Sequence, residues 1–185
     1  MTTQEAISIF RSDFDNIGLT ISNAMAEELV AQGHKATGRL LNSIARETTK
    51  LLDGLQTEIS HFDYGVIVNK GVTADRIPFG RGSGGNSKFI TALMNWVRFK
   101  GIAGGLEKNI ISCTFAIARK MKKEGSPTRG AYRFSSNGRR LEWTDYVILS
   151  QSQYIESEIT ELSDRFIENL YWAKIEEIAN KYIQV

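Results

Sequence analysis

The glycine pattern Gly80-x-Gly82-x-x-Gly85 is the first candidate for chemistry, because closely spaced glycines ahead of a helix can cradle a phosphate. A dinucleotide-binding loop needs a strand that runs directly into the first glycine, and Pro78 would remove a hydrogen-bond donor from that strand. The acid expected about twenty residues later could only be Glu107, where no second strand ends. A Gly-Lys-Ser/Thr loop does not occur. The pattern therefore predicts no nucleotide site.

The same stretch is instead typical of a flexible loop, which we place over residues 72–87. Such a loop leaves the compact domain and becomes ordered against a partner. It would carry three basic side chains outward, Arg76, Arg81 and Lys88.

Residues that could bind metal or act as nucleophiles are few. The histidines are His34 and His61, and His61-x-Asp63 on a strand would supply two metal ligands without a third. Cys113 is the only cysteine, which excludes an internal disulfide and fits a small residue of the core or of an interface. Since no acid, base and nucleophile come together, the sequence predicts a protein that is not an enzyme and has no cofactor or metal.

Charge is unevenly distributed along the chain. Residues 1–69 carry a net charge of −4, residues 70–140 carry +12 and residues 141–185 carry −6. A basic middle between acidic ends can bind the phosphates of nucleic acid or the acidic ends of a neighbouring copy, and composition does not choose between them.

The densest basic cluster lies in "ARKMKKEGSPTRGAYRFSSNGRR", where Tyr132 and Phe134 are interleaved with the charges. The cluster could neutralise phosphates, or its charges could favour a helix end and solubility. Its members are Arg119, Lys120, Lys122, Lys123, Arg129, Arg133, Arg139 and Arg140.

The elements that would position these residues follow from hydrophobic spacing over 185 residues, of which 42% are hydrophobic. This length predicts a single domain, 1–185, with no membrane span or secretory signal and production in a cytoplasm. Apolar residues at every third or fourth position predict a helix over 1–33, which Gly18 would bend or break and Gly33 would end. A similar pattern predicts a C-terminal helix over 151–185.

An α+β core is expected over residues 34–150. Two β-prone runs flank Asp53-Gly54, which favours a type I′ hairpin turn, and Tyr64–Val68 is predicted to be a further strand. Helices are predicted from a Ser87 cap to Lys100 and from Glu107 to Glu124, and these would pack on the sheet. Another hairpin-like turn is predicted at Asn137-Gly138.

The order of several short motifs resembles the tail-completion family, the head-to-tail joining proteins of tailed bacteriophages. One is a Thr-Gly-Arg-Leu-x-x-Ser-Ile element before the sheet; others are a Leu-x-x-Trp-Val element with Lys-Gly, an Ala-Ile-Ala helix and a Gly-x-Pro-x-Arg turn. The matching positions are Thr37, Gly38, Arg39, Leu40, Ser43, Ile44, Leu93, Trp96, Val97, Lys100, Gly101, Ala116–Ala118, Gly125, Pro127 and Arg129.

This resemblance implies a structural virion protein, made in the host bacterial cytoplasm, that forms a homomeric ring of six or twelve copies in the neck. Its partners would be other neck, portal or tail proteins, with non-specific contact to the genomic DNA that passes through the ring. The three basic residues of the loop and the eight of the basic cluster would then lie at an interface or line the DNA channel. The Thr37 hydroxyl is expected to cap a short helix, which makes this motif structural. The alternative function is a free nucleic-acid-binding protein that uses residues 119–140.

Overall fold

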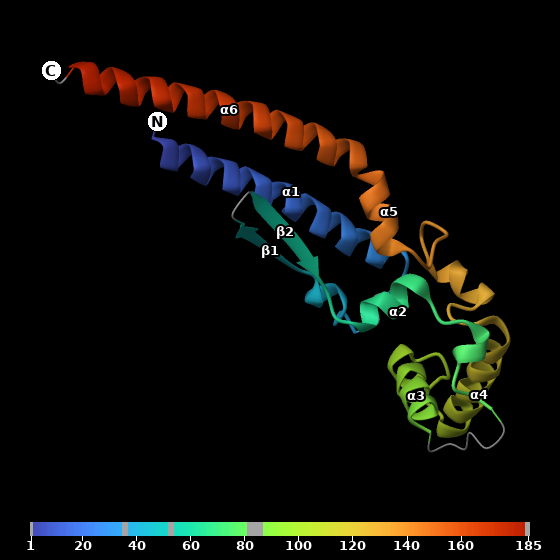
Figure 1. Cartoon of the computed structure of the whole chain (residues 1–185). Coiled ribbons are helices and arrows are strands. Elements are labelled where there is room, and N and C mark those ends of the chain that lie inside the picture. The colour runs from blue at the N-terminus through green and yellow to red at the C-terminus, as the bar shows by residue number, and fades with distance from the viewer. Residues whose placement is uncertain (1, 35–36, 52–53, 81–86, 184–185) are drawn as a thin grey trace. The chain divides into compact units, whose positions relative to one another are not determined.

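The computed structural model describes residues 2–34, 37–51, 54–80 and 87–183. The fold is α+β, with long first and last helices and, in the described part of the chain, one two-stranded antiparallel sheet (Figure 1). The chain divides into two compact units: unit 1 comprises residues 1–28, 40–62 and 143–185, and unit 2 comprises residues 29–39 and 63–142. The prediction of a single domain stays a prediction.

Two long helices form the frame of unit 1. α1 spans Thr3–Ala31, and α6 spans Ser152–Ile183 after the short helix α5, Trp143–Ser150. α6 runs antiparallel to α1, since the ring of Phe166 lies 4.4 Å from that of Phe10 while the Tyr154 hydroxyl donates to Thr20 Oγ1 (Figure 1). The predicted terminal helices are therefore confirmed. Their buried residues include Ala6, Ile17, Leu162 and Ala173.

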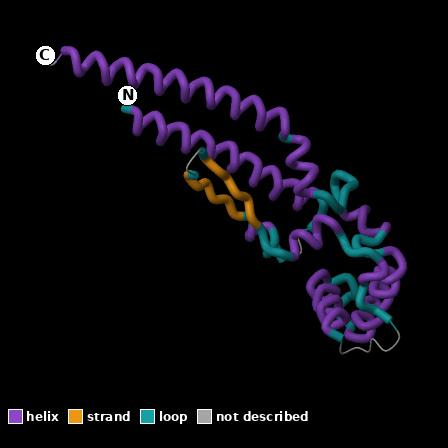
Figure 2. The backbone as a smooth tube through the Cα atoms, viewed as in Figure 1, coloured by secondary structure: helices purple, strands orange, loops and turns teal. Residues whose placement is uncertain are grey.

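The predicted hairpin is also present in unit 1. β1, Ala45–Lys50, pairs antiparallel with β2, Leu55–Ser60, with Thr48 opposite Thr57 (Figure 2). The amide of Leu51 donates to the carbonyl oxygen of Gly54 at 2.8 Å. The turn predicted at Asp53-Gly54 includes residue 53, which lies outside the described residues. A 3₁₀ turn, η1, Leu41–Ser43, precedes β1.

α1 continues through Gly18, so this glycine does not break the helix; it lets the hairpin approach the helix. A Cβ atom at Gly18 would lie 2.6 Å from Thr57 Cγ2 and 3.0 Å from Arg46 Cδ. Both distances are shorter than normal carbon contacts. The glycine is therefore explained by packing against the hairpin.

In unit 2 the helices α3, Lys88–Lys100, and α4, Glu107–Glu124, pack against each other. Their bounds are those predicted: the Ser87 side chain accepts a hydrogen bond from the Ile90 amide at 3.2 Å, and Gly101 ends α3 in the left-handed region. Their buried residues are Ile90, Val97, Ile110, Thr114 and Ala118. The hairpin belongs to unit 1, where it contacts α1, so the prediction that α3 and α4 pack on the sheet stays a prediction.

Residues Tyr64–Lys70 form a short helix, α2, so the strand predicted at Tyr64–Val68 is wrong. The buried residues Gly65 and Asn69 are four positions apart, which is the spacing of one helix face. The Asn69 carbonyl oxygen accepts the amide of Glu142 at 2.7 Å, and Gly71 follows the helix. A tertiary contact thus outweighs the β propensity of Val66, Ile67 and Val68.

The described part of the predicted flexible loop is packed into unit 2. Val72 forms an antiparallel bridge with Ser126, η2 spans Ala74–Arg76, and Ile77 is buried. Val72 and Ile77 are thus held by contacts within unit 2, and the flexibility predicted for residues 72–87 stays a prediction. Residues 81–86, which include the second and third glycines of the phosphate-loop pattern, lie outside the described residues.

The segment after α4 is a 3₁₀ helix, η3, Arg129–Phe134, and a turn. Asn137 Oδ1 accepts hydrogen bonds from the Ser135 hydroxyl at 2.7 Å and the Arg139 amide at 3.1 Å. No strand flanks this turn in the described chain, so the hairpin predicted at Asn137-Gly138 is wrong. The turn is therefore held by hydrogen bonds to the Asn137 side chain and not by hydrogen bonds between two strands.

Candidate interaction surface

The outer side of α4 is strongly basic. Successive helical residues are about 100° apart, so Arg119 and Lys123 lie on the side opposite Ile110 and Thr114, which are buried. Both basic side chains are exposed. Lys108 is exposed in the same sector and was missed by the sequence analysis, which counted only the dense run from 119 to 140. Helical periodicity would have found it.

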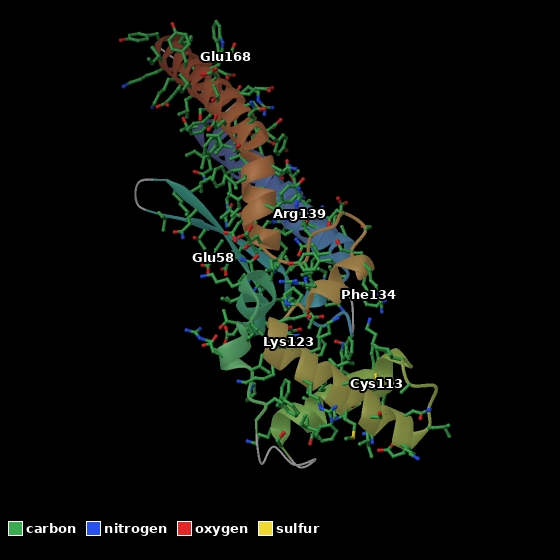
Figure 3. All side chains as sticks on the ribbon, turned by 90° about the vertical axis from the view of Figure 1, so that its right-hand side faces the viewer. Glu58, Cys113, Lys123, Phe134, Arg139 and Glu168 are labelled. Atoms are coloured by element: carbon green, nitrogen blue, oxygen red, sulfur yellow. The ribbon has the colours of Figure 1, made fainter. Side chains whose placement is uncertain are left out.

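η3 lies beside the C-terminal end of α4. The backbone amide of Arg129 donates to Glu124 Oε2 at 3.0 Å, and Lys120 Nζ lies 3.2 Å from where a Cβ atom of Gly130 would be. Phe134 is 64% exposed, and the Arg133 guanidinium lies 4.7 Å from its ring centre, a cation–π distance. We call the exposed basic residues on the outer side of α4, in η3 and in the turn after η3 the basic surface. Figure 3 labels two of them, Lys123 and Arg139, and also the nearby Phe134. Its members are Lys108, Arg119, Lys120, Lys123, Arg129, Arg133 and Arg139.

Lys122, predicted to belong to an interface or DNA channel, binds the backbone of its own unit. Its Nζ donates to the carbonyl oxygens of Ile77 at 3.0 Å and Asp75 at 3.2 Å. Those carbonyls belong to the end of η2, where helical partners run out. The Lys122 ammonium thus joins α4 to η2.

Arg140 is also used inside unit 2. Its Nη1 donates to the carbonyl oxygen of Gln32 at 2.7 Å, next to the end of α1. The hydroxyls of Ser135 and Ser136 donate to the carbonyl oxygen of Ala31 at 3.3 and 3.1 Å. We call this set of contacts the α1 clamp. The last carbonyls of a helix lack helical donors and favour positive charge, so the clamp satisfies both needs.

Burial affects the titration of the α1 clamp. Burial lowers the pKa of Arg140, and burial together with the nearby Arg140 charge lowers the pKa of His34. His34 Nε2 lies 3.0 Å from the Arg140 carbonyl oxygen, which can only accept, so Nε2 carries the hydrogen. Gln32 Nε2 donates to the carbonyl oxygen of Leu141 at 2.9 Å. His34 is thus a neutral structural residue.

The other predicted loop residues are only partly placed. Arg76 is the exposed last residue of η2, and Lys88 is the exposed first residue of α3. Arg81 lies outside the described residues.

The Thr-Gly-Arg-Leu element does not begin a helix, so the capping role predicted for Thr37 is wrong. Thr37 Oγ1 accepts the Arg39 amide at 3.4 Å, a local turn contact, and the η1 helix that follows has no side-chain cap. Gly38 has a φ of +73°, which the first turn of a helix does not contain. The next residues are anchored: Leu40 is buried, and the Ser43 hydroxyl donates to its carbonyl at 2.7 Å and accepts the Phe62 amide.

Unit 1 carries the acidic charge. It contains 6 Lys and Arg against 16 Asp and Glu, a net charge of −10, whereas unit 2 contains 17 against 5, a net charge of +12. We call the shallow, hydroxyl-rich hollow on the exposed side of α6 the acidic surface. It is lined by Gln153, Glu156, Ser157, Thr160, Glu161 and Asp164.

A paired carboxylate lies where the hairpin meets α1. Asp15 accepts two hydrogen bonds from Arg46, at 2.9 and 3.0 Å, and one from the Thr48 hydroxyl at 2.6 Å. These bonds, those from Arg46 first, lower the pKa of Asp15. The Thr48 hydroxyl also bonds that of Thr57 at 2.8 Å. The network is structural, because every partner belongs to the hairpin or the helix that it joins.

The residues predicted to have no catalytic role are placed as follows. His61 follows β2, with Nδ1 2.9 Å from the Phe62 carbonyl oxygen and its ring 5.2 Å from that of Trp143. Cys113 is a free, half-buried thiol of α4. The described residues contain no group of three or more His, Cys, Asp or Glu that could hold a metal ion. Nor does any described helix combine the length and apolar character needed to cross a membrane.

Comparisons with protein-family models, with curated proteins and with solved structures find no match for this chain. The function proposed below therefore depends on the chain's own residues.

Proposed function

We propose that this chain is a structural protein of the head-to-tail junction of a tailed bacteriophage, where copies assemble into a homomeric ring without catalysis. The observation that carries the proposal is the opposite charge of the two compact units, −10 and +12. A ring needs two different, complementary surfaces on each copy, and a basic unit and an acidic unit meet that requirement.

The motifs of the family resemblance support the phage assignment in part. The Thr37–Ile44 element precedes the hairpin, the Trp96-Val97 pair lies on α3, and Gly125 with Pro127 forms the turn after α4. The strand that we predicted at Tyr64–Val68, after the hairpin, is instead the helix α2. The proposed ring contact joins the basic surface of one copy to the acidic surface of the next.

Charge reversal tests this contact. In the basic variant, Arg119→Glu and Lys123→Glu, and in the acidic variant, Glu156→Lys and Asp164→Lys, only exposed side chains change. Each variant alone should lose salt-sensitive association in sedimentation velocity, because like charges face each other. A one-to-one mixture should recover it, because the unchanged acidic surface of the basic variant meets the unchanged basic surface of the acidic variant, and the two reversed surfaces also complement each other. Association of either single variant as strong as that of the wild type would contradict the contact.

The phage role has its own assay. A phage that carries the basic variant should accumulate heads and tails that are not joined, as seen by electron microscopy, while the purified variant keeps its circular dichroism spectrum. Normal particle yield would refute a role in the neck.

Free nucleic-acid binding is the second candidate, and the exposed Phe134 and Tyr132 beside the basic surface favour it. In that case the purified protein binds duplex DNA with an affinity that falls steeply with salt, and the basic variant reduces both affinity and salt slope. A neck protein shows weak duplex binding and joins its partners instead.

A further inference from the structure

The last part of α6 has an apolar face that α1 does not cover. Ala173 is 4% exposed and is the last buried residue of α6 whose side chain is described. The residues of α6 that face α1 are Leu162, Phe166 and Ala173, which are spaced as residues on one face of a helix. We call residues 167–183 the α6 tail; Glu168, labelled in Figure 3, lies near its start. The tail carries a second apolar set, which is exposed by 38 to 77%: Ile167, Tyr171, Trp172, Ile175, Ile178 and Tyr182.

The spacing of this second set is that of a coiled coil. Tyr171, Ile175, Ile178 and Tyr182 are separated by four, three and four residues, which is the alternation of the d and a positions of a heptad. At about 100° per residue they form one narrow stripe, and it lies on roughly the opposite side of α6 from Ala173. Two opposite apolar faces fit a helix that binds α1 on one side and a second helix on the other.

The flanking positions indicate what that second helix is. With Tyr171 at position d, Ile167 falls at g and Trp172 at e. In a parallel homomeric coiled coil, a g residue meets the e residue five positions later on the neighbouring helix, so Ile167 would contact Trp172 of the next copy. This register gives every exposed apolar residue of the tail a partner.

Charge favours the same arrangement. The tail contains three acidic and two basic residues, a net charge of −1. Glu168 falls at an a position in this register, so the apolar contact of a and d residues begins after it, at Tyr171. In a parallel register, Lys174 at g faces Ala179 at e. In an antiparallel register, Lys174 would face Lys181 of the other helix, both at g, and the like charges would repel.

We propose that the α6 tails of two or more copies of this chain bind one another as a short parallel coiled coil. The tail is already helical in unit 1, so association does not have to form the helix. The coiled coil rests on the proposed self-assembly, which brings the copies close to one another. It uses a different surface of the chain, the apolar stripe of the α6 tail.

Disulfide trapping in the full chain tests the register. With Cys113→Ser as background, Tyr182→Cys places thiols at facing a positions, and Asn180→Cys places them on the outer side of the same turn. Under mild oxidation, Tyr182→Cys should form linked dimers about tenfold faster than Asn180→Cys, since a disulfide needs Cβ atoms about 4 Å apart. Adding Ile178→Glu to the Tyr182→Cys chain should reduce that rate to the control rate. Ile178 is 54% exposed, so the fold should survive, and circular dichroism verifies it.

Sedimentation velocity separates the two proposals. In 1 M NaCl the charged ring contact is screened, whereas the apolar tail contact should still hold wild-type chains above the 20.7 kDa monomer mass. Equal oxidation rates at 180 and 182 in chains that associate at low salt would overturn the coiled coil and leave the charged contact standing. Chains that stay monomeric at every salt concentration and form no disulfide would overturn both.

Discussion

Replacing Gly18 with alanine should destabilise unit 1, although Gly18 lies in the middle of a helix. Helix propensity alone predicts the reverse, a gain of about 1 kcal/mol for alanine. The added Cβ atom, however, would lie 2.6 Å from Thr57 Cγ2 and 3.0 Å from Arg46 Cδ. Neither neighbour moves freely, because Thr57 is hydrogen-bonded to Thr48 and Arg46 is paired with Asp15.

The size of the effect follows from these opposing terms. Overpacking of one methyl group costs roughly 1–3 kcal/mol. After the propensity gain, we expect Gly18→Ala to lower the free energy of unfolding by about 1 kcal/mol, which for a chain of this size corresponds to a Tm lower by about 2–4 °C. Thermal unfolding followed by circular dichroism measures this shift.

A second substitution identifies the contact responsible. Thr57→Ser removes only Cγ2 and keeps the hydroxyl that bonds Thr48. The double variant should therefore be more stable than Thr57→Ser alone, by up to about 1 kcal/mol, since alanine then contributes its helix propensity without the closest overlap. A Gly18→Ala protein that melts at or above the wild-type temperature would refute the close-packing explanation of this glycine.

Four other outcomes test the structural assignments. Asp15→Asn should cost about 1 kcal/mol at pH 7 after allowance for solvent screening. The pKa of Asp15 is lower in the folded protein than in the unfolded chain, so this stabilisation is present above the unfolded pKa and is lost as pH falls through the folded pKa. Wild type and variant should therefore converge in stability in acid unfolding curves. Arg140→Gln should lower the free energy of unfolding by about 1–3 kcal/mol in urea titrations, whereas the exposed control Arg119→Gln should change it by about 0.5 kcal/mol or less; equal losses would exclude the α1 clamp. Since the folded pKa of His34 is also lowered, wild-type stability should fall as pH drops below about 6.5, with a slope of at most about 1.4 kcal/mol per pH unit, and His34→Gln should remove that slope. Thr37→Ala should leave the Tm within about 2 °C, because the hydroxyl makes one long turn contact and caps no helix; a larger drop would restore the capping assignment.

Local signals were enough to predict α3 and α4. The Ser87 hydroxyl, the apolar stripes and the glycines at 101 and 125 act within one or two helical turns, so their effect can be deduced from neighbouring residues. The same holds for the hairpin, whose two strands are joined by a short turn. Charge segregation was also visible in the sequence, because net charge requires no coordinates.

Only the tertiary structure decided the positions at which distant segments meet. The β-branched run 66–68 became helical because Asn69 binds Glu142, and Gly18 proved to be a packing residue because the hairpin lies against it. Among the basic residues, Lys122 and Arg140 could not be distinguished from Arg119 and Lys123 by sequence, since the carbonyl groups they bind lie 45 to 108 positions away. The sequence alone determined which residues are charged and which helices can form. The fold determined which of those charged side chains bind the chain itself, because long-range hydrogen bonds depend on the path of the folded backbone, which local propensity does not specify.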